Sequence, residues 1–221
     1  LPGVEARLWG SQEAKQAYVS FTSPHPKYKL IQSKQWGVGL LELPGSYEEY
    51  LDGPAKSYLR RKRRRAVSRG FRFGTFAPTE RIEEIMSINS SAEYRQGKPM
   101  DSDYLDISLL RNYSMDKREF YGVFDRTGVV RAYAYVPLLG DISLLARLLG
   151  HADDLDDGIM YLLVSEIIRE MISRRAEEGA PRWVMYDTFF GAARGLRLFK
   201  ERLGFRPHKV RWVWLPESPA A

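Results

Sequence analysis

Alternating apolar and polar residues predict strands in several parts of the chain. Residues 71–76 alternate in this way, as the strands of a half-buried sheet do. Residues 120–124 and 129–136 flank the turn sequence at 125–128, Asp-Arg-Thr-Gly, and predict a hairpin. Further strands are predicted at residues 29–43, 141–149 and 182–187, and Val210, Trp212 and Trp214 alternate in a closing strand.

Apolar residues at helical spacing predict one long helix, whose start Asp156 or Asp157 can cap. Six residues follow the i, i+3, i+4, i+7, i+8, i+11 spacing of a buried helix face: Met160, Leu163, Val164, Ile167, Ile168 and Met171. Ser46 followed by Glu49 is typical of a capping box at a helix start. Other helices are predicted at residues 55–68, 79–89, 102–113 and 192–203.

Composition excludes several classes of protein and site. The chain has 221 residues, and none of its apolar runs approaches the roughly 18 residues that a membrane-spanning helix needs. It has no cysteine, which excludes disulfides, thiolate zinc sites and a cysteine nucleophile. Its three histidines are scattered, so we expect no metal site. We expect a soluble, cytoplasmic protein.

The net charge of +6 comes from one segment. Eight cations and no acid lie between residues 60 and 72, and without them the net charge would be −2: Arg60, Arg61, Lys62, Arg63, Arg64, Arg65, Arg69 and Arg72. The opposite extreme is an acidic stretch before the long helix, with Asp153, Asp154, Asp156 and Asp157. These two clusters are the most unusual features of the sequence.

The order of predicted elements from residue 71 onward resembles the GNAT acyltransferase superfamily. It runs strand, two helices, three-strand meander, long helix, strand, helix, strand. Residues 198–205, Leu-Phe-Lys-Glu-Arg-Leu-Gly-Phe, resemble the superfamily's helix that ends in a Gly-Phe turn before the last strand. The Phe199-Lys200 pair resembles the Fem-type aminoacyltransferases, which build peptidoglycan cross-bridges in bacteria, and so does the arginine-rich helix before Gly70.

The resemblance implies a fold class and a domain organisation. We expect an α/β fold, with a GNAT-like mixed, twisted sheet flanked by helices in residues 71–215. Residues 1–70 would form a strand-and-helix extension that carries the basic helix and packs on the main domain. Residues 216–221 would be a tail.

The acidic stretch departs from the superfamily pattern. GNAT enzymes that use acetyl-CoA open their long helix with a glycine-rich turn, whose backbone N–H groups hold a pyrophosphate. Here residues 150–158 read Gly-His-Ala-Asp-Asp-Leu-Asp-Asp-Gly, and four carboxylates at that place would repel a phosphate. Three explanations stay open: the donor has no pyrophosphate there, the loop turns its acids outward, or the site has been lost.

Three candidate catalytic residues follow from the resemblance. Lys200 lies where many GNAT enzymes have a tyrosine general acid, and it could stabilise a developing oxyanion. Its pKa would have to fall by burial or through cationic neighbours for it to donate a proton near pH 7. Tyr186 and Asp187 end the preceding strand, and either could orient the acceptor amine or accept its proton. An exposed helix lysine, a core tyrosine and a turn aspartate remain the simpler interpretations.

The predicted substrate-binding residues fall into three groups: Arg60, Arg61, Arg64 and Arg65 on the basic helix, Glu93, Tyr94 and Arg95 in a loop, and Tyr135 on the meander. Six consecutive cations sweep more than one face of a helix. They therefore either grip an anionic partner or pair with acids of the chain itself. The loop lies where GNAT acceptors often bind, and Tyr135 is either core or groove lining.

The function we expect from this resemblance is transfer of an activated acyl or aminoacyl group to an amine acceptor. The donor would be a substrate, acyl-CoA or aminoacyl-tRNA, and no tightly bound cofactor is expected. The alternative is a non-catalytic GNAT-like protein that binds RNA or another polyanion through the helix of Arg60–Arg65. A third hypothesis is a structural domain whose charges pair internally. The sequence leaves open the donor, the acceptor, the pathway, the oligomeric state and whether activity is retained.

Overall fold

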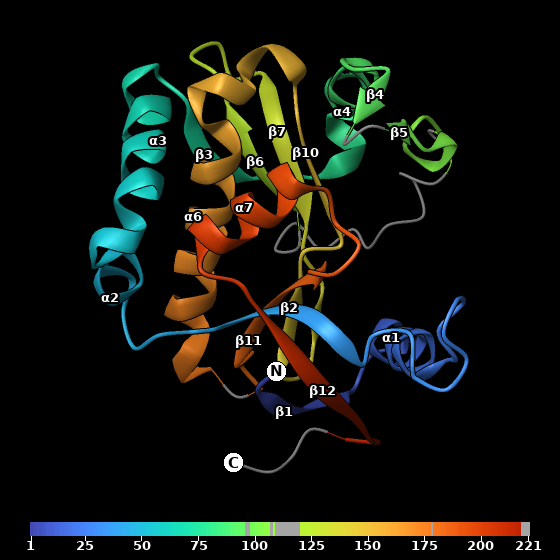
Figure 1. Cartoon of the computed structure of the whole chain (residues 1–221). Helices are drawn as coiled ribbons and strands as arrows, with labels where there is room; N and C mark the ends of the chain where they lie inside the picture. The colour runs from blue at the N-terminus through green and yellow to red at the C-terminus, as the bar shows by residue number, and fades with distance from the viewer. Residues whose placement is uncertain (96–97, 107, 109–119, 178, 218–221) are drawn as a thin grey trace. The chain divides into compact units, whose positions relative to one another are not determined.

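The protein is described by a computed structural model, which places residues 1–95, 98–106, 108, 120–177 and 179–217 (Figure 1). The chain divides into two compact units, each with a sheet of its own. Unit 1 consists of Leu1–Tyr50, Pro137–Leu145 and Ile168–Ala221, and unit 2 of Leu51–Val136 and Ala146–Ile167. The first 70 residues therefore contribute to both units.

Within the described residues, the sheet of unit 1 has six strands in the order β1-β12-β2-β11-β9-β8. These are β1 (Gly3–Trp9), β12 (Arg206–Leu215), β2 (Trp36–Glu42), β11 (Trp183–Thr188), β9 (Ile142–Leu144) and β8 (Leu138–Leu139). β1 is parallel to β12 and β9 to β11, and the other neighbours are antiparallel, so the sheet is mixed. In Figure 1, β1 and β12 lie side by side, and α1 (Gln12–Thr22) contacts both.

The core of unit 1 follows the period-two alternation of its strands. Ala6 and Leu8 of β1 are buried, as are Val210 and Trp212 of β12, and the residues between them are more exposed. Phe21 of α1 packs against Trp212 with the ring planes tilted and the ring centroids 4.8 Å apart. The alternation predicted for the closing strand therefore determines which of its side chains are buried.

The two edges of this sheet meet at Arg7 of β1 and Asp141, which lies between β8 and β9. The buried Asp141 carboxylate accepts hydrogen bonds from the Arg7 backbone N–H at 2.9 Å and from its Nε at 3.0 Å. In return the Asp141 N–H donates to the Arg7 carbonyl at 2.8 Å. This reciprocal pair closes the curled sheet of unit 1.

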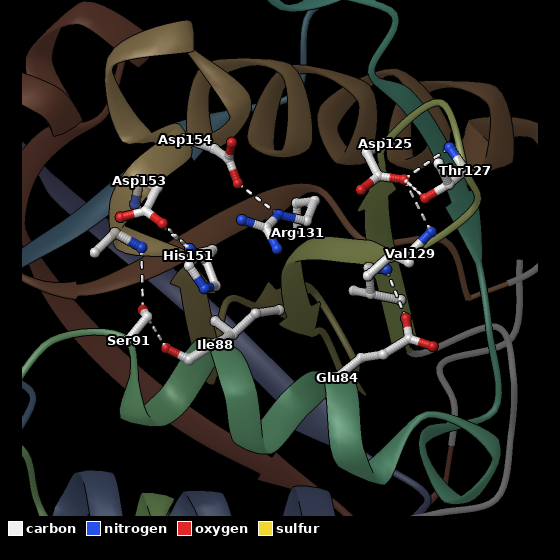
Figure 2. A network of polar contacts seen from close by, with 12 residues as sticks. Glu84, Ile88, Ser91, Asp125, Thr127, Val129, Arg131, His151, Asp153 and Asp154 are labelled. Atoms are coloured by element: carbon white, nitrogen blue, oxygen red, sulfur yellow. Dashed lines mark hydrogen bonds and ion pairs between the residues drawn. The ribbon is translucent and has the colours of Figure 1, made fainter.

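Among the described residues, the sheet of unit 2 has four antiparallel strands in the order β10-β7-β6-β3. These are β10 (Arg147–Gly150), β7 (Val130–Tyr135), β6 (Phe120–Phe124) and β3 (Arg72–Thr75). The predicted hairpin is β6 and β7. Its turn is held by the Asp125 carboxylate, which accepts from the N–H groups of Thr127 and Val129 (Figure 2).

The remaining elements are helices and one short ribbon. The α-helices are α2 (Tyr47–Leu51), α3 (Ser57–Ser68), α4 (Ile82–Ser90), α6 (Ile159–Ser173) and α7 (Arg194–Leu203). The 3-10 helices are Pro54–Lys56, Pro78–Glu80, Ser102–Tyr104, η5 (Ala152–Asp157) and Arg174–Ala176, and β4 (Tyr94–Arg95) pairs with β5 (Lys98–Pro99). α6 is the long helix that the apolar spacing predicts. Its residues up to Ile167 belong to unit 2 and those from Ile168 to unit 1.

One predicted strand is in fact two. Residues 141–149 contain β9 and β10, which belong to different sheets. The change of sheet falls between adjacent residues, because the Leu145 N–H donates to the Met185 carbonyl of unit 1, whereas the Ala146 N–H donates to the Tyr135 carbonyl of unit 2. The residues at the change, Leu144, Leu145 and Ala146, are all apolar, so the sequence gives no sign of it.

Other boundaries also differ from the predictions. The strand predicted from residue 29 is wrong over its first part, where Gln32 makes only an isolated bridge with Pro24, and β2 begins at Trp36. The helices predicted at 55–68 and 79–89 begin two and three residues later, because Pro54 and Pro78 each begin a 3-10 turn. β1 and α1 were not predicted. Half of the helix predicted at 102–113 lies outside the described residues, and its described beginning is the 3-10 helix Ser102–Tyr104.

No helix in the part of the chain that the structure describes combines the length and the apolar character needed to cross a membrane.

We expect Asp141→Ala to lower the free energy of unfolding of the protein by about 2–4 kcal/mol, because it leaves the Arg7 guanidinium and N–H without their buried acceptor. Glu42→Ala is the matched control: it removes an ion pair with Arg182 whose side chains are 54% and 64% exposed, and should cost less than about 1 kcal/mol. Urea unfolding of both variants measures the difference. Equal losses would show that Asp141 does not close the sheet.

Candidate active site

β11 bulges at Tyr186 and Asp187, the residues that end the predicted strand. Met185 pairs with Leu40 and Thr188 with Val38, so two residues of β11 lie opposite the single Gly39 of β2. A Cβ atom at Gly39 would lie 2.9 Å from the Tyr186 carbonyl oxygen, closer than real Cβ contacts allow. The bulge therefore requires glycine at this position of β2.

Asp187 adopts the left-handed backbone conformation, with φ of 43°, and no other non-glycine residue in the described ranges has a positive φ. Aspartate tolerates this conformation better than most residues do. Its side chain is 59% exposed and forms an ion pair with Lys34, which lies just before β2. Lys34 is a site residue that the sequence did not indicate, because it lies 153 positions away from its partner.

Lys200 of α7 holds the bulge from inside unit 1. It is 1% exposed, and its Nζ donates to the carbonyl oxygens of Tyr186 and Thr188, both at 2.8 Å. Nζ also lies 4.5 Å from the centroid of the Tyr186 ring. A buried ammonium group is tolerated only where acceptors compensate its lost hydration, and here the acceptors are two main-chain carbonyls.

Burial lowers the pKa of Lys200 to about 8, the nearby Lys34 adds to this effect, and Asp187 opposes it. The ammonium form has three N–H donors and the neutral amine has two. Loss of one proton therefore leaves a donor for each of the two carbonyls. The group can change its charge near pH 8 without giving up the hydrogen bonds that hold the bulge.

Unit 1 thus brings the three predicted catalytic residues together at the end of β11. Lys200 is buried, Asp187 is exposed, and the Tyr186 ring contacts Phe199 and Phe205 edge-on. The interpretation of Lys200 as an exposed helix lysine is wrong. The catalytic roles of all three remain predictions.

In unit 2 the basic helix α3 pairs with the acidic stretch that precedes α6. The Arg65 guanidinium lies 2.9 Å from the Asp157 carboxylate, and Arg69 lies 3.6 Å from the same group. Lys62 Nζ donates to the Asp156 carbonyl at 2.8 Å. The two unusual clusters of the sequence therefore meet, which is the internal pairing that the sequence left open.

A second group of contacts fixes η5 to β7 and α4. Arg131 Nε donates to the Asp154 carboxylate at 2.6 Å, and the Ala152 N–H donates to Ser91 Oγ, which caps the end of α4 (Figure 2). The loop thus pairs Asp154 and Asp157 with arginines and exposes Asp153 and Asp156, of which Asp153 lies 3.7 Å from His151 Nδ1.

The other cations of α3 have mixed surroundings. Arg63 binds Glu166, which is 3% exposed, with Nη2 at 2.6 Å. Arg60 donates to the carbonyl oxygens of Leu51 and Gly53. Arg61 and Arg64 are exposed and, among the described residues, have no acidic partner; Arg61 lies over the Tyr58 ring. The predicted substrate-binding role of the basic helix therefore depends mainly on Arg61 and Arg64.

The loop and meander residues lie in unit 2. Arg95 binds the carbonyl oxygens of Ile88 and Gly150 at 2.9 and 3.1 Å, and its Nε is buried without a partner in the described residues. Glu93 and Tyr94 are exposed. Tyr135 is buried and stacked on Phe120 at 4.8 Å. The structure therefore places Arg95 and Tyr135 in packing roles, and their substrate contacts stay predictions.

No group of three or more histidine or acidic side chains suited to a metal ion occurs in the residues that the structure places.

The element order and the mixed, curled sheet define a GNAT-like α/β fold, as the sequence predicts. No protein-family model and no curated protein matches the chain. Among solved structures, FemX superposes with a TM-score of 0.58 at 10% identity, over 78% of this chain and 59% of that chain. The predicted likeness to Fem-type proteins is thereby confirmed at the level of the fold.

Two further structures share the fold. One is the C-terminal domain of an Agrobacterium fabrum protein described as a lysylphosphatidylglycerol synthetase, with a TM-score of 0.52 and 15% identity over 78% of this chain and 58% of that chain. The other is a conserved protein of unknown function from Bacteroides thetaiotaomicron, with a TM-score of 0.51 and 13% identity over 78% of this chain and 59% of that chain. Each match spans a little more than half of the other chain.

We expect Arg63→Ala to lower the free energy of unfolding by about 3 kcal/mol, because it removes a cationic partner of the buried Glu166 carboxylate. Arg61→Ala, two positions earlier on the same helix, should change it by less than about 0.5 kcal/mol. Denaturant titrations followed by circular dichroism compare the two. A loss at Arg61 as large as at Arg63 would contradict the assigned pairing.

Proposed function

We propose that the protein transfers an activated acyl or aminoacyl group to an amine. The proposal is supported by a fold shared with FemX and by the arrangement at the end of β11. The observation that carries it is the buried Lys200 ammonium, which donates to two main-chain carbonyls beside the exposed Asp187 carboxylate and whose pKa is lowered to about 8 by burial. Such a pair is uncommon for purely structural purposes, because perturbed ionisable groups gather at functional sites.

The chemistry needs few protein groups, because the ester or thioester of the donor is already activated. An amine attacks the donor carbonyl, and negative charge develops on the carbonyl oxygen. Lys200 is buried and acts on that oxygen through its positive charge, without direct contact, and the bulge that Lys200 holds fixes the position of the strand end. Asp187 orients the acceptor amine and accepts its proton, directly or through water.

The donor class stays open between acyl-CoA and aminoacyl-tRNA. Both carry phosphates, and the pairing of Asp154 with Arg131 and of Asp157 with Arg65 weakens the charge argument against such donors. The acceptor is an amine of unassigned identity. A protein without catalytic activity that binds a polyanion is the alternative, and it would depend mainly on Arg61 and Arg64.

We expect purified protein to form an amide from an amine and one of the two donor classes, detected by mass spectrometry of the product. Asp187→Asn and Lys200→Met should each lower kcat/KM about 100-fold or more, through loss of the base and of the oxyanion stabilisation. Lys15→Met, an exposed lysine of α1, is the matched control and should retain activity.

The same assay has a pH signature. Because the charged form of Lys200 is the active one, kcat should fall as the pH rises through about 8, where the ammonium loses its proton. Asp187→Asn is an exposed substitution that tests the site even if Lys200→Met disturbs folding. Full activity in both variants would contradict the assignment of the site, and absence of turnover with both donor classes would contradict the proposed function.

A further inference from the structure

A groove of about 610 Å³ runs along α7 in unit 1 and has no part in the proposed reaction. One face of α7 lines it with residues at i, i+3, i+4 and i+7: Arg194, Arg197, Leu198 and Glu201. Arg206 at the start of β12 and Phe190 from the loop after β11 complete the lining that matters here. Three arginines and one glutamate give the groove a net charge of +2.

Two of the three arginines of the groove make no polar side-chain contact with the rest of the described chain. In the ranges that the structure describes, neither Arg194 nor Arg197 makes an ion pair or a side-chain hydrogen bond, and both side chains are exposed. Arg206 is held in place, because its Nη1 donates to the carbonyl oxygens of Glu201 and Phe205 at 3.2 and 3.0 Å. Three guanidinium groups around one groove, with no acid bonded to them, favour an anion with several acceptor oxygens.

The groove also presents apolar surface to solvent. Phe190 is 54% exposed and Leu198 is 41% exposed. The Phe190 ring is packed against the backbone of Gly37, where a Cβ atom would lie 2.2 Å from it. The ring is therefore held in the groove by close packing, although half of it faces solvent. An exposed aromatic ring fixed beside arginines is suited to a ligand with an apolar part next to its charge.

We propose that this groove binds a phosphate monoester whose organic group is apolar. A phosphate dianion matches the charge of +2, and its oxygens can accept from the forked N–H groups of Arg194, Arg197 and Arg206. The organic group lies on Phe190 and Leu198. A carboxylate offers fewer acceptors and half of the charge, so it binds more weakly. The site is separate from Lys200, and its occupancy does not depend on acyl transfer.

Isothermal titration calorimetry of the full chain with phenyl phosphate, inorganic phosphate and benzoate tests the proposal. Phenyl phosphate should bind about tenfold or more tightly than inorganic phosphate, through burial of the ring, and more tightly than benzoate. Arg194→Ala combined with Arg197→Ala should weaken binding of both phosphates about tenfold or more. Phe190→Ala should weaken phenyl phosphate and leave inorganic phosphate unchanged.

Two controls make the test specific. Arg72→Ala removes an exposed arginine of β3 in unit 2 and should leave all affinities unchanged. Glu201→Gln removes the acid of the groove without changing its shape and should tighten phosphate binding several-fold. The proposal is overturned by absence of phenyl phosphate binding, by equal affinity for inorganic phosphate or benzoate, or by an unchanged affinity in the double arginine variant.

Discussion

A buried ammonium group must be given hydrogen-bond acceptors, and Lys200 obtains them from the backbone of β11. To supply two carbonyls the strand bulges, and to make room for the bulge β2 carries Gly39 in place of a residue with a side chain. The same bulge places Asp187 in the left-handed region with its carboxylate in solvent. Burial of the Lys200 ammonium group therefore accounts both for the geometry of the candidate site and for the lowered pKa of Lys200.

In unit 2, part of the charge of the clusters at 60–72 and 153–157 is paired within the chain. Arg65 and Arg69 neutralise Asp157, and Arg131 neutralises Asp154. Several charged side chains of these two clusters therefore form ion pairs within the chain. This argues against a grip on nucleic acid by the whole basic helix, and it leaves Arg61 and Arg64 as its exposed cations without an acidic partner in the described ranges.

Residue patterns revealed the elements that repeat a period over many residues, such as β6, β7 and α6. They failed where the structure of a segment depends on contacts with residues that lie far away in the sequence. The split of residues 141–149 between two sheets depends on which strand each N–H meets, and the residues on both sides of the split are apolar. Lys200 could be selected because it sits in a recognisable Phe-Lys pair, whereas Lys34, Gly39 and the groove along α7 depend on packing between segments that no local pattern connects.

We expect the buried Lys200 ammonium group to lose its proton near pH 8. The most direct measurement is a pH titration of the side-chain ¹⁵Nζ resonance of Lys200 in protein labelled with ¹⁵N-lysine, assigned by the signal that disappears in Lys200→Arg. We expect a midpoint at a pH of about 8, below the ordinary lysine pKa of 10.5. A Lys200 signal that titrates together with those of the exposed lysines would contradict it.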